Sequence, residues 1–124
     1  ECNDRGRFVH ALYGFCDIRH FTPLTEVLKR DVVQVVNAFA RIVHKCVTEN
    51  YGYPNKNIGD AFLLVWKPKL NLGATEVADA ALRSYVCICI EIARSSELKR
   101  WARKEEIQSR MPGFTMQMGF GLHH

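Results

Sequence analysis

Two acidic side chains stand where a carboxylate could do chemistry. Asp17 comes directly after an apolar, aromatic segment, Phe8–Cys16, and Asp60 lies in a Gly-Asp turn between two short segments. Each is ordinary alone, because Asp often caps a turn and Gly-Asp is common in hairpins. If the hairpin lies beside the first strand, the two carboxylates converge at one sheet edge and repel unless divalent cations lie between them. Two cations held by two aspartates suit phosphoryl or nucleotidyl transfer.

The polar loop that follows Asp17 leads into a helix. Thr22 is expected to be the N-cap of this helix, with Pro23 at its first position. Backbone N–H groups and the helix dipole at such an N-terminus favour an anion such as phosphate. A carboxylate does not bind phosphate itself, but it holds the Mg²⁺ that does. The loop therefore predicts a phosphate and cation site beside Asp17.

Hydrophobic periodicity predicts the elements that position these residues. Strands are expected at Phe8–Cys16, Asn55–Ile58, Ala61–Trp66 and Phe114–Leu122. Helices are expected after Thr22, from Asp31 to about Asn50, and from Thr75 to about Ala93. Pro68–Gly73 is expected to be a loop, and the charged stretch Ser95–Arg110 an exposed helical tail or surface excursion. The order β-α-α-β-β-α-β indicates an α+β fold with helices on one face of a mainly antiparallel sheet.

Composition narrows the classes of function. The chain has 124 residues, of which 48% are hydrophobic, and a net charge of +4. This length suits one domain, and the longest apolar runs, Ala61–Trp66 and Tyr85–Ile90, are far shorter than a membrane span. No Lys/Arg run exceeds two residues, so we expect no nucleic-acid partner. The five cysteines lack metal-ligand spacing and are expected to be unpaired, in a reducing cytoplasmic environment.

Three segments in order resemble the catalytic domain of class III nucleotide cyclases, adenylate type: Phe15–Thr22, Asn55–Phe62 and Met118–His123. The resemblance extends over nearly the whole chain and implies a ferredoxin-like sheet covered by helices. It also implies that residues 1–124 are the N-terminal portion of that domain. Positions for the family's second base-selecting residue and its transition-state Asn and Arg are not found in the chain. The isolated chain is therefore expected to be nearly inactive.

The resemblance assigns roles to individual residues. Asp17 and Asp60 match the two catalytic, metal-binding aspartates, and the Ile18 carbonyl matches a further metal ligand. Two Mg²⁺ or Mn²⁺ ions are implied, one lowering the pKa of the ribose 3′-hydroxyl that attacks the α-phosphate and the other clamping the triphosphate. The backbone amides of Phe21 and Thr22 match the positions that bind the β- and γ-phosphates.

Lys56 matches the position that selects the base. Adenylate cyclases typically carry Lys there and guanylate cyclases Glu, since an ammonium donates to the N1 acceptor of adenine. ATP is thus the implied substrate, converted to cyclic AMP and pyrophosphate. His20 departs from the family pattern, which commonly has Gly at this position, so His20 must adopt a backbone conformation that Gly adopts freely.

The resemblance also implies a dimer with the site at its interface. The partner is an identical chain or a second cyclase domain, and membrane attachment would come only from segments outside this chain. Three alternatives remain open. The chain is a guanylate cyclase, a regulatory cyclase-like half that activates another domain, or a small basic nucleic-acid binder. Intact Asp17 and Asp60 disfavour the regulatory half, and the lack of an aromatic stacking platform disfavours the nucleic-acid binder.

Overall fold

The structure, a computed structural model, describes residues 11–67 and 73–124. Its strands are β1 (Leu12–Ile18), β2 (Tyr53–Ile58), β3 (Ala61–Trp66) and β4 (Met118–His123). Its helices are α1 (Phe21–Leu28), α2 (Val32–Glu49), α3 (Ala74–Arg94), α4 (Ser96–Ala102) and α5 (Glu105–Arg110), and a 3₁₀ turn (Lys29–Asp31) joins α1 to α2. The expected order of elements and the α+β class are confirmed. The start of the expected first strand, Phe8–His10, and most of the expected loop, residues 68–72, lie outside the described residues.

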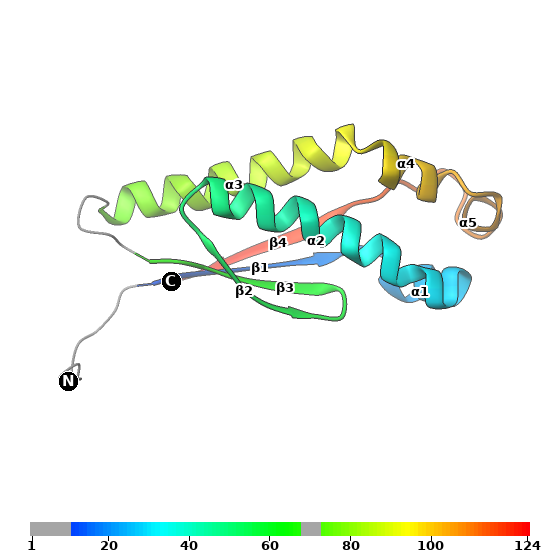
Figure 1. Cartoon of the computed structure of the whole chain (residues 1–124), viewed down its shortest axis with the longest axis horizontal. Coiled ribbons are helices and arrows are strands. Elements are labelled where there is room, and N and C mark those ends of the chain that lie inside the picture. Colours follow the sequence, from blue (N-terminus) through cyan, green and yellow to red (C-terminus); the bar gives the residue numbers. More distant parts are fainter. Residues whose placement is uncertain (1–10, 68–72) are drawn as a thin grey trace.

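The four described strands form one antiparallel sheet in the order β2-β3-β1-β4. Helices α2 and α3 run side by side over one face of this sheet (Figure 1). Figure 1 shows no helix on the opposite face among the described residues. The chain is therefore a two-layer structure with one buried and one uncovered sheet face.

The core lies between the sheet and α2 and α3. Its largest fully buried side chains include Trp66 and Leu64 of β3 and Phe39 of α2. The Trp66 ring meets the ring of Tyr85 from α3 edge-on, with 5.8 Å between centroids. A Cβ at Gly14 of β1 would overlap both side chains, so only glycine leaves room for them.

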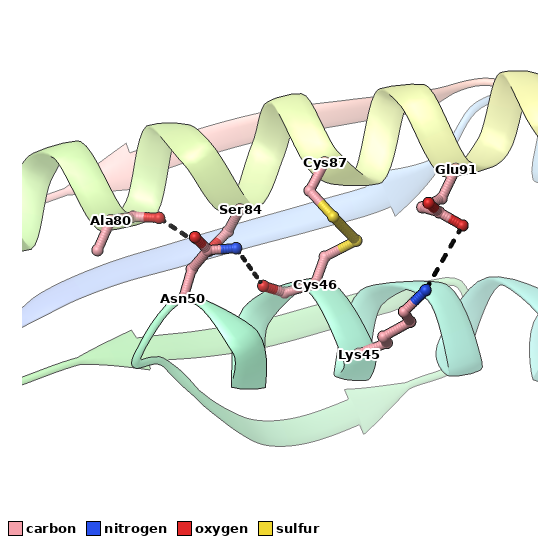
Figure 2. Close-up of a disulfide and its surroundings, with 7 residues drawn as sticks. All are labelled: Lys45, Cys46, Asn50, Ala80, Ser84, Cys87 and Glu91. Carbon is pink, nitrogen blue, oxygen red and sulfur yellow. Dashed lines mark hydrogen bonds and ion pairs between the residues drawn. A yellow bond between two sulfur atoms is a disulfide. The ribbon is translucent and has the colours of Figure 1, made fainter.

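A disulfide between Cys46 and Cys87 joins α2 to α3 across 41 residues of sequence, with 5.7 Å between the Cα atoms (Figure 2). Beside it, the Asn50 side-chain amide donates to the Cys46 carbonyl at 2.8 Å, and Lys45 faces Glu91 at 3.9 Å. The expectation that all cysteines are unpaired is wrong for these two. Their partners come from different helices, which no local spacing pattern reveals.

The segment Ser95–Arg110 is not an exposed tail. It forms α4 and α5, whose Leu98 and Ile107 are fully buried against the core. The Ser95 hydroxyl caps α4 by accepting from the Leu98 N–H at 3.1 Å. The buried residues, Leu98 and Ala102 in α4 and Ile107 in α5, dock the two short helices but are too few to produce a visible apolar stripe in the sequence. No helix of the described part of the chain is long and apolar enough to cross a membrane.

Candidate active site

Asp17 lies on the uncovered face of the sheet. Its neighbours Cys16 and Ile18 are 0% and 3% exposed beneath the helices. Because successive side chains of a strand point to opposite faces, Asp17 and Phe15 point away from the helices. The expected strand end at Cys16 is two residues too early, because pairing with Gly119 and Met118 of β4 extends β1 to Ile18.

The turn that carries Asp60 lies beside the end of β1. Asp17 is directly opposite Ala61, and the Ile18 N–H donates to the Asp60 carbonyl at 3.0 Å. Gly59 makes the turn possible, since its φ of 59° is in the left-handed region that favours glycine. The expectation that the hairpin brings both aspartates to one end of neighbouring strands is confirmed for the backbone.

The Asp17 carboxylate has an unused acceptor atom. Its Oδ1 is buried and receives no hydrogen bond, and the nearest cation, the Arg19 Nε, is 3.7 Å from it. A buried carboxylate oxygen without a donor costs free energy unless a cation binds it. This oxygen fits the hard divalent cations that prefer carboxylate ligands. Within the described residues, no group of three or more His, Cys, Asp or Glu side chains is placed to hold a metal ion.

The N-terminus of α1 lies next along the chain. The helix begins at Phe21, so Phe21 and Thr22 occupy its first two positions and their N–H groups have no acceptor within the helix. The expectation that Thr22 is the N-cap is wrong. His20 holds that place without a side-chain cap, in the left-handed conformation with φ 57° and ψ 37°. The resemblance requires His20 to adopt a backbone conformation that glycine adopts freely, and His20 does adopt it.

His20→Gly is expected to leave the free energy of unfolding unchanged or raise it by up to about 1 kcal/mol, because the left-handed region costs an L-residue about that much. The only aromatic contact recorded for the His20 ring, within the described residues, is edge-on to Phe114 at 6.3 Å. His20→Val is the matched variant and should destabilise the chain by about 1 kcal/mol or more. Urea denaturation measures both. A His20→Gly protein clearly less stable than the wild type would contradict the backbone argument.

Lys56 is exposed on β2 and lies opposite Leu63 of β3, which in turn lies opposite Phe15 of β1. Residues directly opposite each other share a sheet face. Lys56 therefore lies on the same uncovered face as Asp17, two strands away. A register shift between Pro54 and Lys56 bends β2 just before this position.

Two neighbours of Asp17 were not identified from the sequence. Burial, and then the charge of Asp17, raise the pKa of Cys16 to about 12, so this thiol stays protonated at neutral pH and is a core side chain. Arg19 makes an ion pair with Asp17. Arg19 follows Asp17 by two residues, and residues two apart in extended backbone point to the same side, which was the signal available in the sequence.

Several solved structures of adenylyl and guanylyl cyclases match this chain. The structure of a bacterial light-regulated adenylyl cyclase matches 92% of this chain and 52% of its own at 28% identity, with a TM-score of 0.65. The GTP-bound guanylate cyclase domain of RhGC from Catenaria anguillulae matches 90% of this chain and 54% of its own at 20% identity, with a TM-score of 0.64. A non-canonical dimeric guanylyl cyclase domain of the RhoGC fusion protein from the aquatic fungus Blastocladiella emersonii matches 93% of this chain and 57% of its own at 19% identity, with a TM-score of 0.65.

The chain therefore has the fold of adenylyl and guanylyl cyclase domains, and it spans about half the length of these structures. No family model and no curated protein matches the sequence. These neighbours are class III nucleotide cyclase domains, and the fold of this chain is the one found in that class. These neighbours include both adenylyl and guanylyl enzymes.

Proposed function

We propose that this chain is part of an adenylyl cyclase catalytic domain that converts ATP to cyclic AMP and pyrophosphate. The observation that carries the proposal is the buried Oδ1 of Asp17, which receives no hydrogen bond. It lies in a strand paired beside the Asp60 turn, in a fold shared with nucleotide cyclases. A purely structural Asp at this place would have a hydrogen-bond donor on that oxygen.

The metal-binding role is assigned to the Asp17 and Asp60 carboxylates and the Ile18 carbonyl. Two Mg²⁺ or Mn²⁺ ions held there would lower the pKa of the ribose 3′-hydroxyl and neutralise charge on the triphosphate. The Phe21 and Thr22 N–H groups at the start of α1 bind the β- and γ-phosphate oxygens. These contacts orient the α-phosphate for attack. The same N–H groups stabilise the negative charge of the pyrophosphate as it leaves.

Lys56 supplies the preference for adenine. An ammonium donates a hydrogen bond to N1 of adenine, whereas guanine presents an N1–H donor that a lysine leaves unpaired. An unpaired polar group in a binding site is costly, so the wrong base is rejected. The 28% identical structure is an adenylyl cyclase, in agreement with this assignment.

Lys56→Glu is expected to reduce turnover of ATP about 10- to 100-fold and to raise turnover of GTP, because the carboxylate accepts from guanine N1–H and repels the adenine acceptor. Cyclic AMP and cyclic GMP are measured with each substrate in the full-length protein. Lys99→Glu, which makes the same charge change on α4, is the control. An unchanged preference for ATP would remove Lys56 from base selection.

A second cyclase domain, from an identical chain or from a related one, is the proposed partner. The uncovered sheet face exposes Tyr13 by 45%, Phe15 by 52% and Ile58 by 62%. Large apolar side chains gathered on a sheet face that no described helix covers favour association. Two such faces would enclose the nucleotide between them. We place the domain in the cytoplasm, where its nucleotide substrate is found.

The assay that tests the proposed function is formation of cyclic AMP from ATP with Mn²⁺ or Mg²⁺ by the full-length protein. Activity that requires the metal and exceeds activity with GTP supports the proposal. Nucleotide binding without turnover would instead favour the regulatory half. Affinity for oligonucleotides that falls with salt and needs no metal would favour the nucleic-acid binder.

A further inference from the structure

Arg19 is placed against the carboxylate that the proposed function uses to hold a metal. Its Nε lies 3.7 Å from the Asp17 Oδ1, and the two side chains are 55% and 44% exposed. This separation is too long for a hydrogen bond. Arg19 thus neutralises charge at Asp17 without occupying the oxygen's lone pairs, which agrees with Oδ1 having no donor.

A glycine in the neighbouring strand provides the space for this guanidinium. Gly119 of β4 lies opposite Asp17. A Cβ at Gly119 would overlap the Nε, Cζ and an Nη atom of Arg19. The Arg19 backbone is anchored on the same side, because its N–H donates to the Gln117 carbonyl at 2.9 Å. The guanidinium therefore lies flat over a strand position with no side chain.

We propose that Arg19 is an internal counter-ion of Asp17 that a divalent cation must displace. Gly119, which has no side chain, leaves the space that the Arg19 guanidinium occupies. The inference rests on the proposed function, because it gives Asp17 the role of metal ligand. It adds a residue that sets metal affinity without binding the metal.

Electrostatics explains why this arrangement is displaceable. Ion pairs between half-exposed side chains contribute only about 0.2–1 kcal/mol, so a doubly charged ion that coordinates Asp17 directly outcompetes Arg19. While the Arg19 guanidinium lies over Gly119, it repels the arriving cation and lowers the affinity of Asp17 for that cation. The long arginine side chain can swing into solvent from the same backbone position. The metal therefore binds most tightly when the guanidinium has left Gly119.

The test is Mn²⁺ binding to this chain, measured by electron paramagnetic resonance of free Mn²⁺, which needs no turnover. Arg19→Gln removes the counter-ion, and Gly119→Ala moves it, since the added methyl meets only the far end of a flexible side chain. Both are expected to bind Mn²⁺ about twofold to fivefold more tightly than the wild type, the factor a surface ion pair supplies. Arg100→Gln, which removes an exposed arginine of α4, is the control and should match the wild type.

A dissociation constant for Mn²⁺ in Arg19→Gln or Gly119→Ala that equals or exceeds that of the wild type overturns the counter-ion proposal. Asp17→Asn separates this failure from failure of the proposed function. If Asp17→Asn loses Mn²⁺ binding while Arg19→Gln matches the wild type, Arg19 is no counter-ion and Asp17 remains the metal ligand. If Asp17→Asn binds Mn²⁺ like the wild type, both the counter-ion and the metal-ligand role are wrong.

Discussion

Replacing Asp17 or Asp60 with Asn is expected to lower the rate of cyclic nucleotide formation at least about 100-fold in the full-length protein. Asn keeps the shape of the side chain but loses the charge that two divalent cations require between the strand β1 and the turn beside it. With one of the two carboxylates gone, the proposed site holds the cations less tightly against the triphosphate. The rate is measured with saturating Mn²⁺ and ATP, and the Mn²⁺ concentration is then varied to detect a weakened site.

The matched control is Asp79→Asn, the same exchange at an exposed position of α3, which should retain the wild-type rate. Stability provides a second readout. The Asp17 Oδ1 is buried and receives no hydrogen bond, and its ion pair with Arg19 is half-exposed, so Asp17→Asn should change the free energy of unfolding by less than about 1 kcal/mol. Loss of activity with full stability separates a catalytic residue from a structural one. Equal activity in Asp17→Asn and the wild type would refute the proposed function.

The strands and helices that position the site could be predicted because their patterns are strong and local. Ala61–Trp66 is an unbroken apolar run and forms β3 with those bounds. The helix expected from Asp31 to about Asn50 is α2, whose apolar residues recur at helical spacing. The Gly-Asp turn followed from a dipeptide with a known backbone preference. In each case the information lies within a few neighbouring residues.

The ends of β1 and α1 could not be predicted in the same way. Asp17 and Ile18 read as a polar loop, but their hydrogen-bonding partners in β3 and β4 extend the strand. Thr22 has the residue type of an N-cap, but the left-handed His20 is the N-cap, so the helix begins two residues earlier than expected. A strand's end depends on its neighbours in the sheet, which come from 40 or more residues away in β3. Tertiary pairing overrides local preference here.

The contacts around Asp17 could not be predicted from the sequence either, because they too depend on the pairing of distant strands. Arg19 is close to Asp17 in sequence. Gly119, which leaves room for the Arg19 guanidinium, comes from the last strand, and the sheet order β2-β3-β1-β4 brings the two residues together. The Cys46–Cys87 pair likewise needs two helices, α2 and α3, that lie antiparallel and side by side over one sheet face. Residue types mark candidates for chemistry, and topology decides which candidates meet.

Reducing the Cys46–Cys87 disulfide is expected to lower the free energy of unfolding by up to about 4 kcal/mol, since a cross-link that closes a loop of 41 residues restricts the unfolded chain by about that amount. The folded state should change little, because Cys46 is fully buried and a buried thiol packs like a small apolar side chain. Urea denaturation with and without a phosphine reductant measures the difference.

Cysteine variants show whether a loss of stability on reduction comes from breaking the disulfide or from another effect of the reductant. Cys46→Ala with Cys87→Ala should be as unstable as the reduced wild type and insensitive to reductant, whereas Cys89→Ser, at an exposed unpaired cysteine, should keep the full response. A wild type whose stability ignores the reductant would mean that the disulfide is absent in solution. Lys56 lies in β2, which follows α2 through Gly52, and the folded backbone around it is expected to stay the same without the cross-link. The reduced protein should therefore denature at a lower urea concentration while its preference for ATP over GTP, which depends on Lys56 itself, stays the same.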